Sequence, residues 1–525
     1  MLDQIPVAFL FFAGALFVPA LPKGAARGLL LLALPLFAGW TVWNLPMGDL
    51  SAVNFFGFSL ELMRVDKLAR VFGLIFCLAA FLGNLYAWHV RDTVQQIAAL
   101  LYAGSAIGAV FAGDLITLFF YWEGTAIASV FLIWARGTEG AYNTGMRYLI
   151  IQIGSGVILL AGAILFYRET GSIAFELMTL GSPATWLIFL SFGIKCAFPL
   201  LHNWLQDSYP AATITGTVIL SAFTTKLAVY ALARGFAGTE ILIYIGAVMT
   251  LFPIFFAEIE NDLRRVLAYS LNNQLGFMVV GIGIGTEMAL NGTASHAFAH
   301  ILYKALLFMS VGAVMLRTGT SKASELGGLY RTMPLTAVFC LVGAASISAF
   351  PLFSGFVTKS LILDQAANQH YPIIWGILVF ASAGVLSHSG IKIPFFTFFA
   401  HDSGMRPKEA PKHMLLAMGI TAKTHEARFN AACGRLFDLA GDLVARVRRG
   451  QDRENYVARM VAAFDANGDC SHEDLLNTIV ISIFGGVDTT RALLGLGLSL
   501  FIENPVQWRA LRADAALIPA AIEEI

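Results

Sequence analysis

Charged side chains are scarce in this sequence. Asp, Glu, Lys and Arg together make up 13% of its 525 residues, whereas soluble globular proteins carry roughly 25%. Hydrophobic residues make up 57%, and the mean hydropathy is +0.71. This composition excludes an ordinary soluble protein for most of the chain and indicates a protein that lies largely in a lipid bilayer.

An excess of positive charge and closely spaced cysteines are also absent. The 34 Lys and Arg residues balance 34 Asp and Glu residues, so the whole chain lacks the basic character of nucleic-acid-binding proteins. The five cysteines lie far apart and show none of the spacings of a metal site. We expect no cleavable signal peptide, because the first apolar stretch follows the acidic Asp3 and lacks a small-residue cleavage site.

Long apolar runs dominate the chain before residue 400. A membrane-spanning helix needs roughly 20 mostly apolar residues, and about thirteen runs meet this condition. They lie near residues 5–22, 28–44, 68–89, 95–112, 114–135, 147–167, 184–205, 212–234, 240–257, 266–286, 288–316, 334–363 and 373–399. We therefore predict an all-α polytopic membrane protein. Lys and Arg are concentrated in alternate loops, which predicts an amino terminus outside and a thirteenth run that ends in the cytoplasm.

The composition changes abruptly after about residue 420. From Thr421 to Asp469 the chain is rich in charge, and its apolar residues recur at helical spacing, as in an amphipathic soluble helix. No linker rich in Pro, Gly or Ser separates the two regions. We therefore predict a membrane domain over residues 1–420 and a soluble, cytoplasmic helical fragment over residues 421–525.

A few ionisable residues interrupt the apolar runs. Charge at bilayer depth costs several kcal/mol, so such residues are expected to be rare and functional. Glu123 lies near the middle of a run, where its carboxylate would be protonated or face a cation; the structural alternative is a single hydrogen bond. Lys195 lies just before Pro199, which breaks its helix, and Lys226 lies in the next run. Because broken helices persist in membranes only beside protein or a watery cavity, Lys195 is a candidate ion or proton site.

A row of titratable residues follows in the run at 288–316. His296, His300 and Lys304 are each four residues apart, so they share one helical face. A row of this kind favours a proton path over three unrelated core residues. A metal site is the alternative for the two histidines, although no third ligand is obvious nearby.

The second break lies at Pro351, before Lys359. Two helices therefore pair a lysine with a proline break, about half of the membrane region apart, as an inverted-repeat transporter would. Lys392, before Pro394, has two interpretations of equal weight: it snorkels to the nearby cytoplasmic surface, or it takes part in function.

Four stretches of the membrane region resemble a known family. "GDLITLFFYWEGTAIASVFLIW", "GIKCAFPLLHNWLQDSYPAATITGTVILSAFTTKLAVYALAR", "HAFAHILYKALLF" and "AFPLFSGFVTKSLIL" are similar to the antiporter-like subunits of Mrp-type cation/proton antiporters and of the proton-pumping arm of respiratory complex I. The resemblance implies about fourteen helices that form two inverted repeats, each with a broken helix. "IKIPFFTFFAHDSGMRPKEAPKHMLLAMGI" favours the D-type subunit of the Mrp antiporter.

The resemblance also assigns roles to the ionisable residues. Proton-channel roles fall on Glu123, Lys195, Lys226 and Lys359, and the connecting path on His296, His300 and Lys304. In the family, the glutamate and the first lysine are thought to form a switchable ion pair that changes the affinity of the lysine for its proton. No cofactor is implied, because residues 1–420 carry no flavin, iron–sulfur or nucleotide signature. The implied partners are other subunits of a hetero-oligomeric assembly.

The tail resembles a different family. "HEDLLNTIVISIFGGVDTTRALLGLGLSLFIENPVQWRALRADAALIPAAIEEI" is similar to bacterial cytochromes of the P-four-fifty type, the haem-thiolate monooxygenases, in which Asp488 and Thr489 would deliver protons to bound dioxygen. That family's Glu-x-x-Arg motif would begin at about Glu524 without its arginine, and the haem-ligating cysteine that follows is absent. We therefore expect a non-functional fragment without haem. It replaces the fourteenth membrane helix that the first family would continue after Met414–Ile420.

Three functions follow from these patterns. The favoured one is a subunit of a cation/proton antiporter in the bacterial plasma (inner) membrane, which exchanges protons for a monovalent cation such as Na⁺. The alternative is a proton-pumping membrane subunit of a complex I-like NADH:quinone oxidoreductase. The third is a membrane-tethered haem monooxygenase, and the missing thiolate argues against it.

Overall fold

The structure, a computed structural model, describes residues 4–450, 456–466 and 475–476. The chain forms two compact units, Met1–Glu426 and Ala427–Ile525. The predicted oxygen-activation residues Asp488 and Thr489, together with Glu524, lie outside the described residues. The first unit contains every predicted proton-transfer residue.

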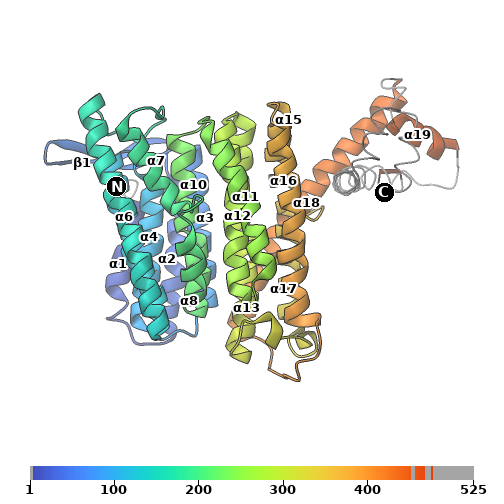
Figure 1. The fold of residues 1–525 in the computed structure, drawn as a ribbon, viewed down its shortest axis with the longest axis horizontal. Helices are drawn as coiled ribbons and strands as arrows, with labels where there is room; N and C mark the ends of the chain where they lie inside the picture. The colour runs from blue at the N-terminus through green and yellow to red at the C-terminus, as the bar shows by residue number, and fades with distance from the viewer. Residues whose placement is uncertain (1–3, 451–455, 467–474, 477–525) are drawn as a thin grey trace, which may run out of the picture. The chain divides into compact units, whose positions relative to one another are not determined.

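The first unit is a bundle of helices that stand side by side (Figure 1). In chain order they are α1 Val7–Phe17, α2 Ala25–Asn44, α3 Lys67–Tyr86, α4 Thr93–Phe111, α5 Leu115–Trp134, α6 Glu139–Thr170, α7 Pro183–Lys195, α8 Asn203–Ala211, α9 Ile214–Ala222, α10 Thr224–Gly235, α11 Ile241–Ile259, α12 Leu263–Ile284, α13 Glu287–Thr318, α14 Pro334–Ile347, α15 Ser354–Asn368, α16 Pro372–Val385, α17 Lys392–Pro394 and α18 Lys412–Arg448. Two π-helical segments, Leu386–Ile391 and Phe395–Phe399, flank α17. The predicted fold class, a polytopic helical membrane protein, is confirmed.

Nine helical segments in the described part of the chain are long and apolar enough to cross a membrane, and α1, α7 and α14 are shorter apolar helices. The sequence predicts more spans, partly because some apolar runs are divided. The run at 184–205 forms α7 and α8, and the run at 334–363 forms α14 and α15. The prolines thus break two helices inside the bundle, as the sequence predicts.

A β-hairpin between α2 and α3 was missed by the sequence analysis. Strands β1 (Gly48–Phe55) and β2 (Phe58–Val65) pair in antiparallel fashion. The two turn residues, Phe56 and Gly57, both have positive φ, 46° and 84°, as the tight hairpin turns that suit twisted strands require. The backbone of β2 joins the bundle where α5 begins, since the N–H of Gly113 donates to the carbonyl of Glu61 at 2.9 Å. This hairpin marks one end of the bundle, called the hairpin end below.

Two inverted repeats build the bundle, and their starts show the relation. Asp114 caps α5 and Asp262 caps α12, and each carboxylate accepts backbone N–H groups of the first helical turn. Each aspartate also forms a β-bridge to the loop after the next helix, Asp114 to Ala174 and Asp262 to Lys322. The helices that follow the two caps, α5–α6 and α12–α13, end with α6 and α13, both 32 residues long and both closed by a left-handed glycine. Because α5 begins at the hairpin end and α12 at the opposite end, the repeats are inverted.

The two broken helices share one structural element. Residues 197–200 and 349–352 have the same sequence, Ala-Phe-Pro-Leu. In both copies the alanine and the leucine adopt positive φ, 60° and 69° in the first and 56° and 76° in the second. Non-glycine residues adopt this conformation rarely and at a cost, so its repetition identifies the break as a built feature of the fold.

The helix pair α11 and α12 packs backbone against backbone. A Cβ atom on Gly246 would lie 2.6 Å from the backbone nitrogen of Val280, and one on Gly276 would lie 2.6 Å from the carbonyl oxygen of Gly246. Small residues permit this approach, which supplies the van der Waals contact that holds membrane helices together. This interface joins α12 to the helix that precedes it in the chain.

Helix α18 begins at Lys412, and its first turns belong to the first unit. Met414 and Met418 are fully buried, and the hydroxyl of Ser310 on α13 donates to Met418 Sδ at 3.7 Å. In the second unit, α19 (Tyr456–Ala466) contributes Val461 to a small cluster with Val444 and Leu475. α18 is not among the candidate spans. The replacement of a fourteenth membrane helix and the nature of the tail remain predictions.

We predict that Gly276→Ala destabilises the first unit, because the added methyl group meets immovable backbone atoms of α11. The free energy of unfolding should fall by about 1–3 kcal/mol, the usual cost of overpacking. Thermal unfolding in detergent can be followed with a thiol-reactive dye, since Cys77, Cys196 and Cys340 are buried. Gly154→Ala is the matched control, because a Cβ there meets nothing within 4 Å. Equal melting temperatures for the two variants would contradict the close packing.

Candidate functional site

The predicted ionisable residues lie deep in the bundle. Glu123 is half-buried, and the others have at most 1% of their surface exposed: Lys195, Lys226, His296, His300, Lys304 and Lys359. Water cannot stabilise these groups in the interior, so each must find a partner in the protein or change its protonation. Their partners therefore show what the site can do.

Glu123 and Lys195 come from neighbouring elements, α5 and the last residue of α7. The Lys195 ammonium donates to the carbonyl of Trp122 at 2.5 Å and to the hydroxyl of Thr125 at 2.8 Å, and it lies 4.5 Å from the centre of the Trp122 ring. The Lys195 ammonium and the Glu123 carboxylate do not approach within 4.0 Å of each other, so they form no ion pair. Their charges still interact. Glu123 Oε1 is buried and has no hydrogen-bond partner among the described residues. The two groups are thus neighbours that do not touch.

Lys226 lies directly after the interruption between α9 and α10. Phe223 separates the two helices with φ −104° and ψ −69°. The ammonium donates to the carbonyl of Ser221, the penultimate residue of α9, at 2.6 Å and to the hydroxyl of Thr225 at 3.3 Å. The helix break thus exposes a carbonyl that binds the buried cation.

The histidine row on α13 has few partners. His296 Nδ1 shares a hydrogen bond of 2.8 Å with the hydroxyl of Thr358, and its Nε2 has none. Both ring nitrogens of His300 and the ammonium nitrogen of Lys304 also lack a hydrogen-bond partner in the described part of the chain. The two imidazole centroids are 6.2 Å apart. Unpaired polar atoms are rare in protein interiors, and each needs an explanation.

The row lies electrostatically between a lysine of the first repeat and a lysine of the second. The charges of Lys226, on α10, and Lys359, on α15, both act on His296, His300 and Lys304. Lys359 donates to the carbonyl of Ile347, the last residue of α14, at 2.8 Å. The structure therefore brings five of the predicted residues into one buried polar row between Lys226 and Lys359. Lys195 and Glu123 are close to each other in the first repeat.

Neutral polar residues that the sequence analysis did not name extend this row. The Tyr303 hydroxyl donates to Gln274 at 3.0 Å, Gln274 donates to Asn273 at 2.6 Å, and Asn273 donates to the carbonyl of Thr250 at 2.5 Å. These amides come from "SLNNQLGF" on α12. Three adjacent amides in an apolar helix were the available signal, but they carry no charge. The buried His388 was also missed.

Lys392 has a structural role at the end of α11. Its ammonium donates to the carbonyls of Ala257, Glu258 and Glu260 at 2.9, 2.6 and 2.7 Å. Cations at helix carboxyl termini satisfy free carbonyls and oppose the helix dipole. This geometry favours helix capping by Lys392 over the two interpretations that the sequence left open, snorkelling to the surface and a part in function.

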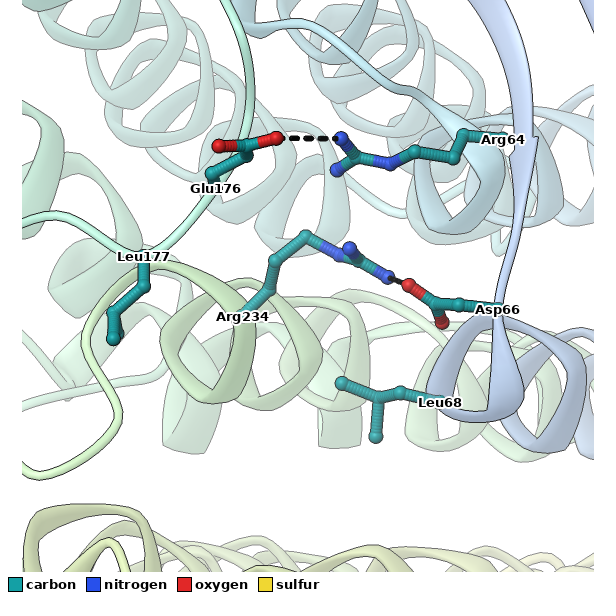
Figure 2. Close-up of a pocket in the computed structure, with 6 residues that line it drawn as sticks. All are labelled: Arg64, Asp66, Leu68, Glu176, Leu177 and Arg234. Atoms are coloured by element: carbon teal, nitrogen blue, oxygen red, sulfur yellow. Dashed lines mark hydrogen bonds and ion pairs between the residues drawn. The ribbon is translucent and has the colours of Figure 1, made fainter. Parts of the chain in front are cut away.

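A cluster of ion pairs lies at the hairpin end, where α10 ends (Figure 2). Arg234 pairs with Asp66 at 2.5 Å, and Arg64 pairs with Glu176 at 3.8 Å, around a cavity of about 360 Å³. Asp66 also caps α3. The two pairs join β2, α3, α10 and the loop after α6. They therefore fix the hairpin end of the helix that carries Lys226.

Two arginines fix the other end of the same region, between α8 and α9. Arg264 is buried and donates to the carbonyls of Pro210 and Ala212 at 2.9 Å each, and to the hydroxyl of Thr217. Arg136 donates to the Pro210 carbonyl as well, at 2.6 Å. A guanidinium fork suits this set of acceptors, which an ammonium could not satisfy together. The α8–α9 turn is therefore held from two sides.

The comparison with protein families identifies the fold. The family described as NADH:quinone oxidoreductase/Mrp antiporter, transmembrane, matches residues 112–386, more than half of the chain. The chain belongs to this family. The matched region contains all seven predicted residues and both Ala-Phe-Pro-Leu breaks, so the buried polar row lies within the family's shared part. Within the described residues, no group of three or more His, Cys, Asp and Glu side chains could hold a metal ion.

Curated relatives include several kinds of membrane subunit. The D-type subunit of the Na⁺/H⁺ antiporter of Alkalihalophilus pseudofirmus is 29% identical over 68% of this chain and 75% of its own length. Hydrogenase-4 component B of Escherichia coli is 26% identical over 69% and 61%, and the L-type subunit of the NADH-quinone oxidoreductase of Campylobacter jejuni is 28% identical over 70% and 64%. The chain thus spans less than two thirds of the length of the last two.

Solved structures agree on the fold. A chain of the Mrp complex from Dietzia sp. has a TM-score of 0.72 at 20% identity and covers 82% of this chain and 94% of its own. A chain of respiratory complex I from Thermus thermophilus has a TM-score of 0.69 at 21% identity and covers 81% and 96%. The family's helical membrane fold is therefore shared across transporters and respiratory complexes.

We predict that Arg264→Lys lowers the free energy of unfolding by about 1–3 kcal/mol, because it leaves buried carbonyls of the α8–α9 turn without donors. The melting temperature in detergent measures this effect. Arg265→Lys is the control at the adjacent position, where the side chain is 43% exposed and its ion pair with Glu260 spans 3.7 Å; such surface pairs contribute about 0–1 kcal/mol. A similar loss in both variants would count against a specific role of the Arg264 fork.

Proposed function

We propose that this chain is a membrane subunit of a multisubunit cation/proton antiporter, which translocates protons in exchange for a monovalent cation such as Na⁺. The observation that carries the proposal is the buried row of titratable groups inside a bundle of this family. Six of the seven predicted residues have at most 1% of their surface exposed. Ionisable groups in a membrane interior cost free energy, so they are retained where they have a function. The relation to the D-type subunit of a Na⁺/H⁺ antiporter supports the exchanged ions.

The first transfer is between Glu123 and Lys195. Lys195 rests on the Trp122 carbonyl and the Thr125 hydroxyl, while Glu123 Oε1 has no hydrogen-bond donor in the described part of the chain. A rotation of the lysine side chain would exchange these partners for the carboxylate. Formation and loss of this ion pair would change the affinity of Lys195 for its proton and drive release to the next group.

The later transfers use the row on α13. A neutral imidazole can accept a proton at one nitrogen and donate from the other, so His300 and His296 can relay protons between Lys226 and Lys359. Lys304 lies in the same row and can take part in these transfers. The proton path then runs along the middle of the bundle from the first broken helix to the second.

Two further assignments belong to this proposal. The chain would lie in the bacterial plasma membrane with its amino terminus outside, and it would assemble with small antiporter subunits. Residues 1–420 would form the proton-translocating domain, and residues 421–525 a cytoplasmic fragment without catalytic function or cofactor.

A complex I-like assembly is the second candidate. The relation to the L-type subunit of an NADH-quinone oxidoreductase, together with the shared fold of complex I, favours it as an alternative. In that setting the same row would pump protons without exchanging a cation. Flavin and iron–sulfur proteins would then copurify with the chain in place of small antiporter subunits, and mass spectrometry of the purified complex distinguishes the two assemblies.

We predict that Lys195→Ala abolishes cation-dependent proton movement in the complex reconstituted into vesicles, because it removes the first proton carrier. A pH-sensitive dye inside the vesicles reports transport. Lys67→Ala, which removes an exposed lysine at the start of α3, should leave transport unchanged. Wild-type exchange by the Lys195 variant would remove this residue from the mechanism.

A second prediction concerns the position of Glu123. A Cβ atom on Gly156 would overlap Glu123 Oε1, so Gly156→Ala must displace the carboxylate. Misplacing a reacting group by about 1 Å can cost on the order of 100-fold in rate, and we expect cation-dependent proton movement to fall by at least roughly tenfold. Gly154→Ala, two positions earlier on the same helix in open space, should transport like the wild type. Equal rates for both variants would show that the carboxylate does not need its observed position.

A further inference from the structure

His388 is a buried histidine that the mechanism above does not use. It lies in the π-helical segment Leu386–Ile391 and is fully buried. Its Nδ1 shares a hydrogen bond of 2.8 Å with the hydroxyl of Ser389, which donates to the hydroxyl of Ser270 on α12, also at 2.8 Å. Its Nε2 has no hydrogen-bond partner among the described residues. One nitrogen is thus oriented by a neighbour and the other is available.

The backbone at His388 is unusual. π-Helical segments are rare and are found frequently at functional sites, because they reposition a side chain at the expense of regular hydrogen bonding. This segment interrupts the last helical element of the second repeat, between α16 and α17. In the first repeat the corresponding last element, α9–α10, is also interrupted, and Lys226 lies at that interruption. Each repeat therefore places a buried titratable side chain where its last helix is irregular.

Three lysines act electrostatically on the His388 ring. The charges of Lys304 on α13 and Lys359 on α15 act on it from the buried row. The charge of Lys392 acts on it from the end of the bundle opposite the hairpin. His388 is therefore within electrostatic reach of the central row and of Lys392 at the end of α11.

A cavity of about 420 Å³ opens at that surface. It is lined by Ser387 and Ile391, which flank His388 in the same segment, and by Lys392 and the carboxylate-bearing Glu258. All three donor positions of the Lys392 ammonium face carbonyls at the end of α11. Lys392 is thus held by these carbonyls, and the carboxylates of Glu258 and Glu260, which line the same cavity, and solvent are proton carriers at the mouth.

We propose that His388 is a further proton-transfer residue, which connects the buried row to the cavity lined by Ser387, Ile391, Lys392 and Glu258. This inference rests on the proposed function, since it supplies the access of the second repeat to the surface opposite the hairpin end. The ring takes up one proton to become imidazolium and releases one proton to Lys359 or Lys304 when that lysine is neutral. It returns to the neutral imidazole, so the step balances without any other reactant.

The first test replaces the ring by an amide of similar size. His388→Gln can keep a hydrogen bond to Ser389 but cannot carry a proton, and we expect cation-dependent proton movement in the reconstituted complex to fall at least tenfold. His401→Gln, which changes an exposed histidine, is the matched control and should transport like the wild type. Melting temperatures of both variants show whether the exchange leaves the fold intact. Wild-type transport by a folded His388→Gln variant would overturn the proposal.

A second test blocks the cavity without changing His388. Ser387→Cys places a thiol at the exposed cavity wall, and a charged, membrane-impermeant thiol reagent should then abolish proton movement. Lys408→Cys, in the exposed loop before α18, and the unmodified chain are the controls, and the same reagent should leave both active. Full activity of the labelled Ser387→Cys variant would overturn the proposal even if His388→Gln does not fold. A complex whose unmodified form moves no protons in response to a cation would instead contradict the proposed function.

Discussion

The bundle depends on one constraint: a buried cation needs an acceptor in the protein, and for Lys226, Lys359 and Arg264 the acceptors are carbonyls at helix ends that the middle of a regular helix does not offer. An α-helix leaves its last four carbonyls free, and the breaks bring such ends into the interior. Lys226 binds a carbonyl at the end of α9, and Lys359 binds the carbonyl of the last residue of α14. Arg264 binds carbonyls at the end of α8 and just after it. The interruptions in the helices therefore create the carbonyl sites of Lys226 and Lys359.

The lysines at the two helix breaks are bound in different ways. The same Ala-Phe-Pro-Leu turn occurs in both, with the same signs and similar values of φ. Lys195 lies just before the first turn and bonds to α5, outside its own broken helix, whereas Lys359 lies after the second and bonds back across it. Lys195 can therefore change partners by a side-chain rotation, while Lys359 is tied to the break itself. In the proposed mechanism the first site would therefore serve switching, and the second would hold a proton at the end of the row.

The sequence predicts the charged part of this site well, because the cost of charge in an apolar run is a local property. Glu123 and the four lysines were visible for this reason, and the spacing of His296 and His300 placed them on one face. Features that depend on contacts between distant segments could not be predicted from the sequence. The amides of "SLNNQLGF" and the β-hairpin carry little local signal, and the only other titratable residue in the run of His388 is Lys392. The role proposed for His388 depends on Lys304, Lys359 and the cavity lined by Ser387. These features come together in the same region of the bundle only in the folded chain.

Lys226 lies in a segment that is fixed at both ends, and this limits how it can move. At the hairpin end Arg234 ties α10 to Asp66, and at the other end Arg264 and Arg136 hold the α8–α9 turn. A translation of α9 and α10 would break both sets of contacts, several of them charge-assisted hydrogen bonds that are roughly twice as strong as neutral ones. The interruption at Phe223 lies between them, next to the carbonyl that binds Lys226. This arrangement favours transfer by local rearrangement at the break over sliding of whole helices.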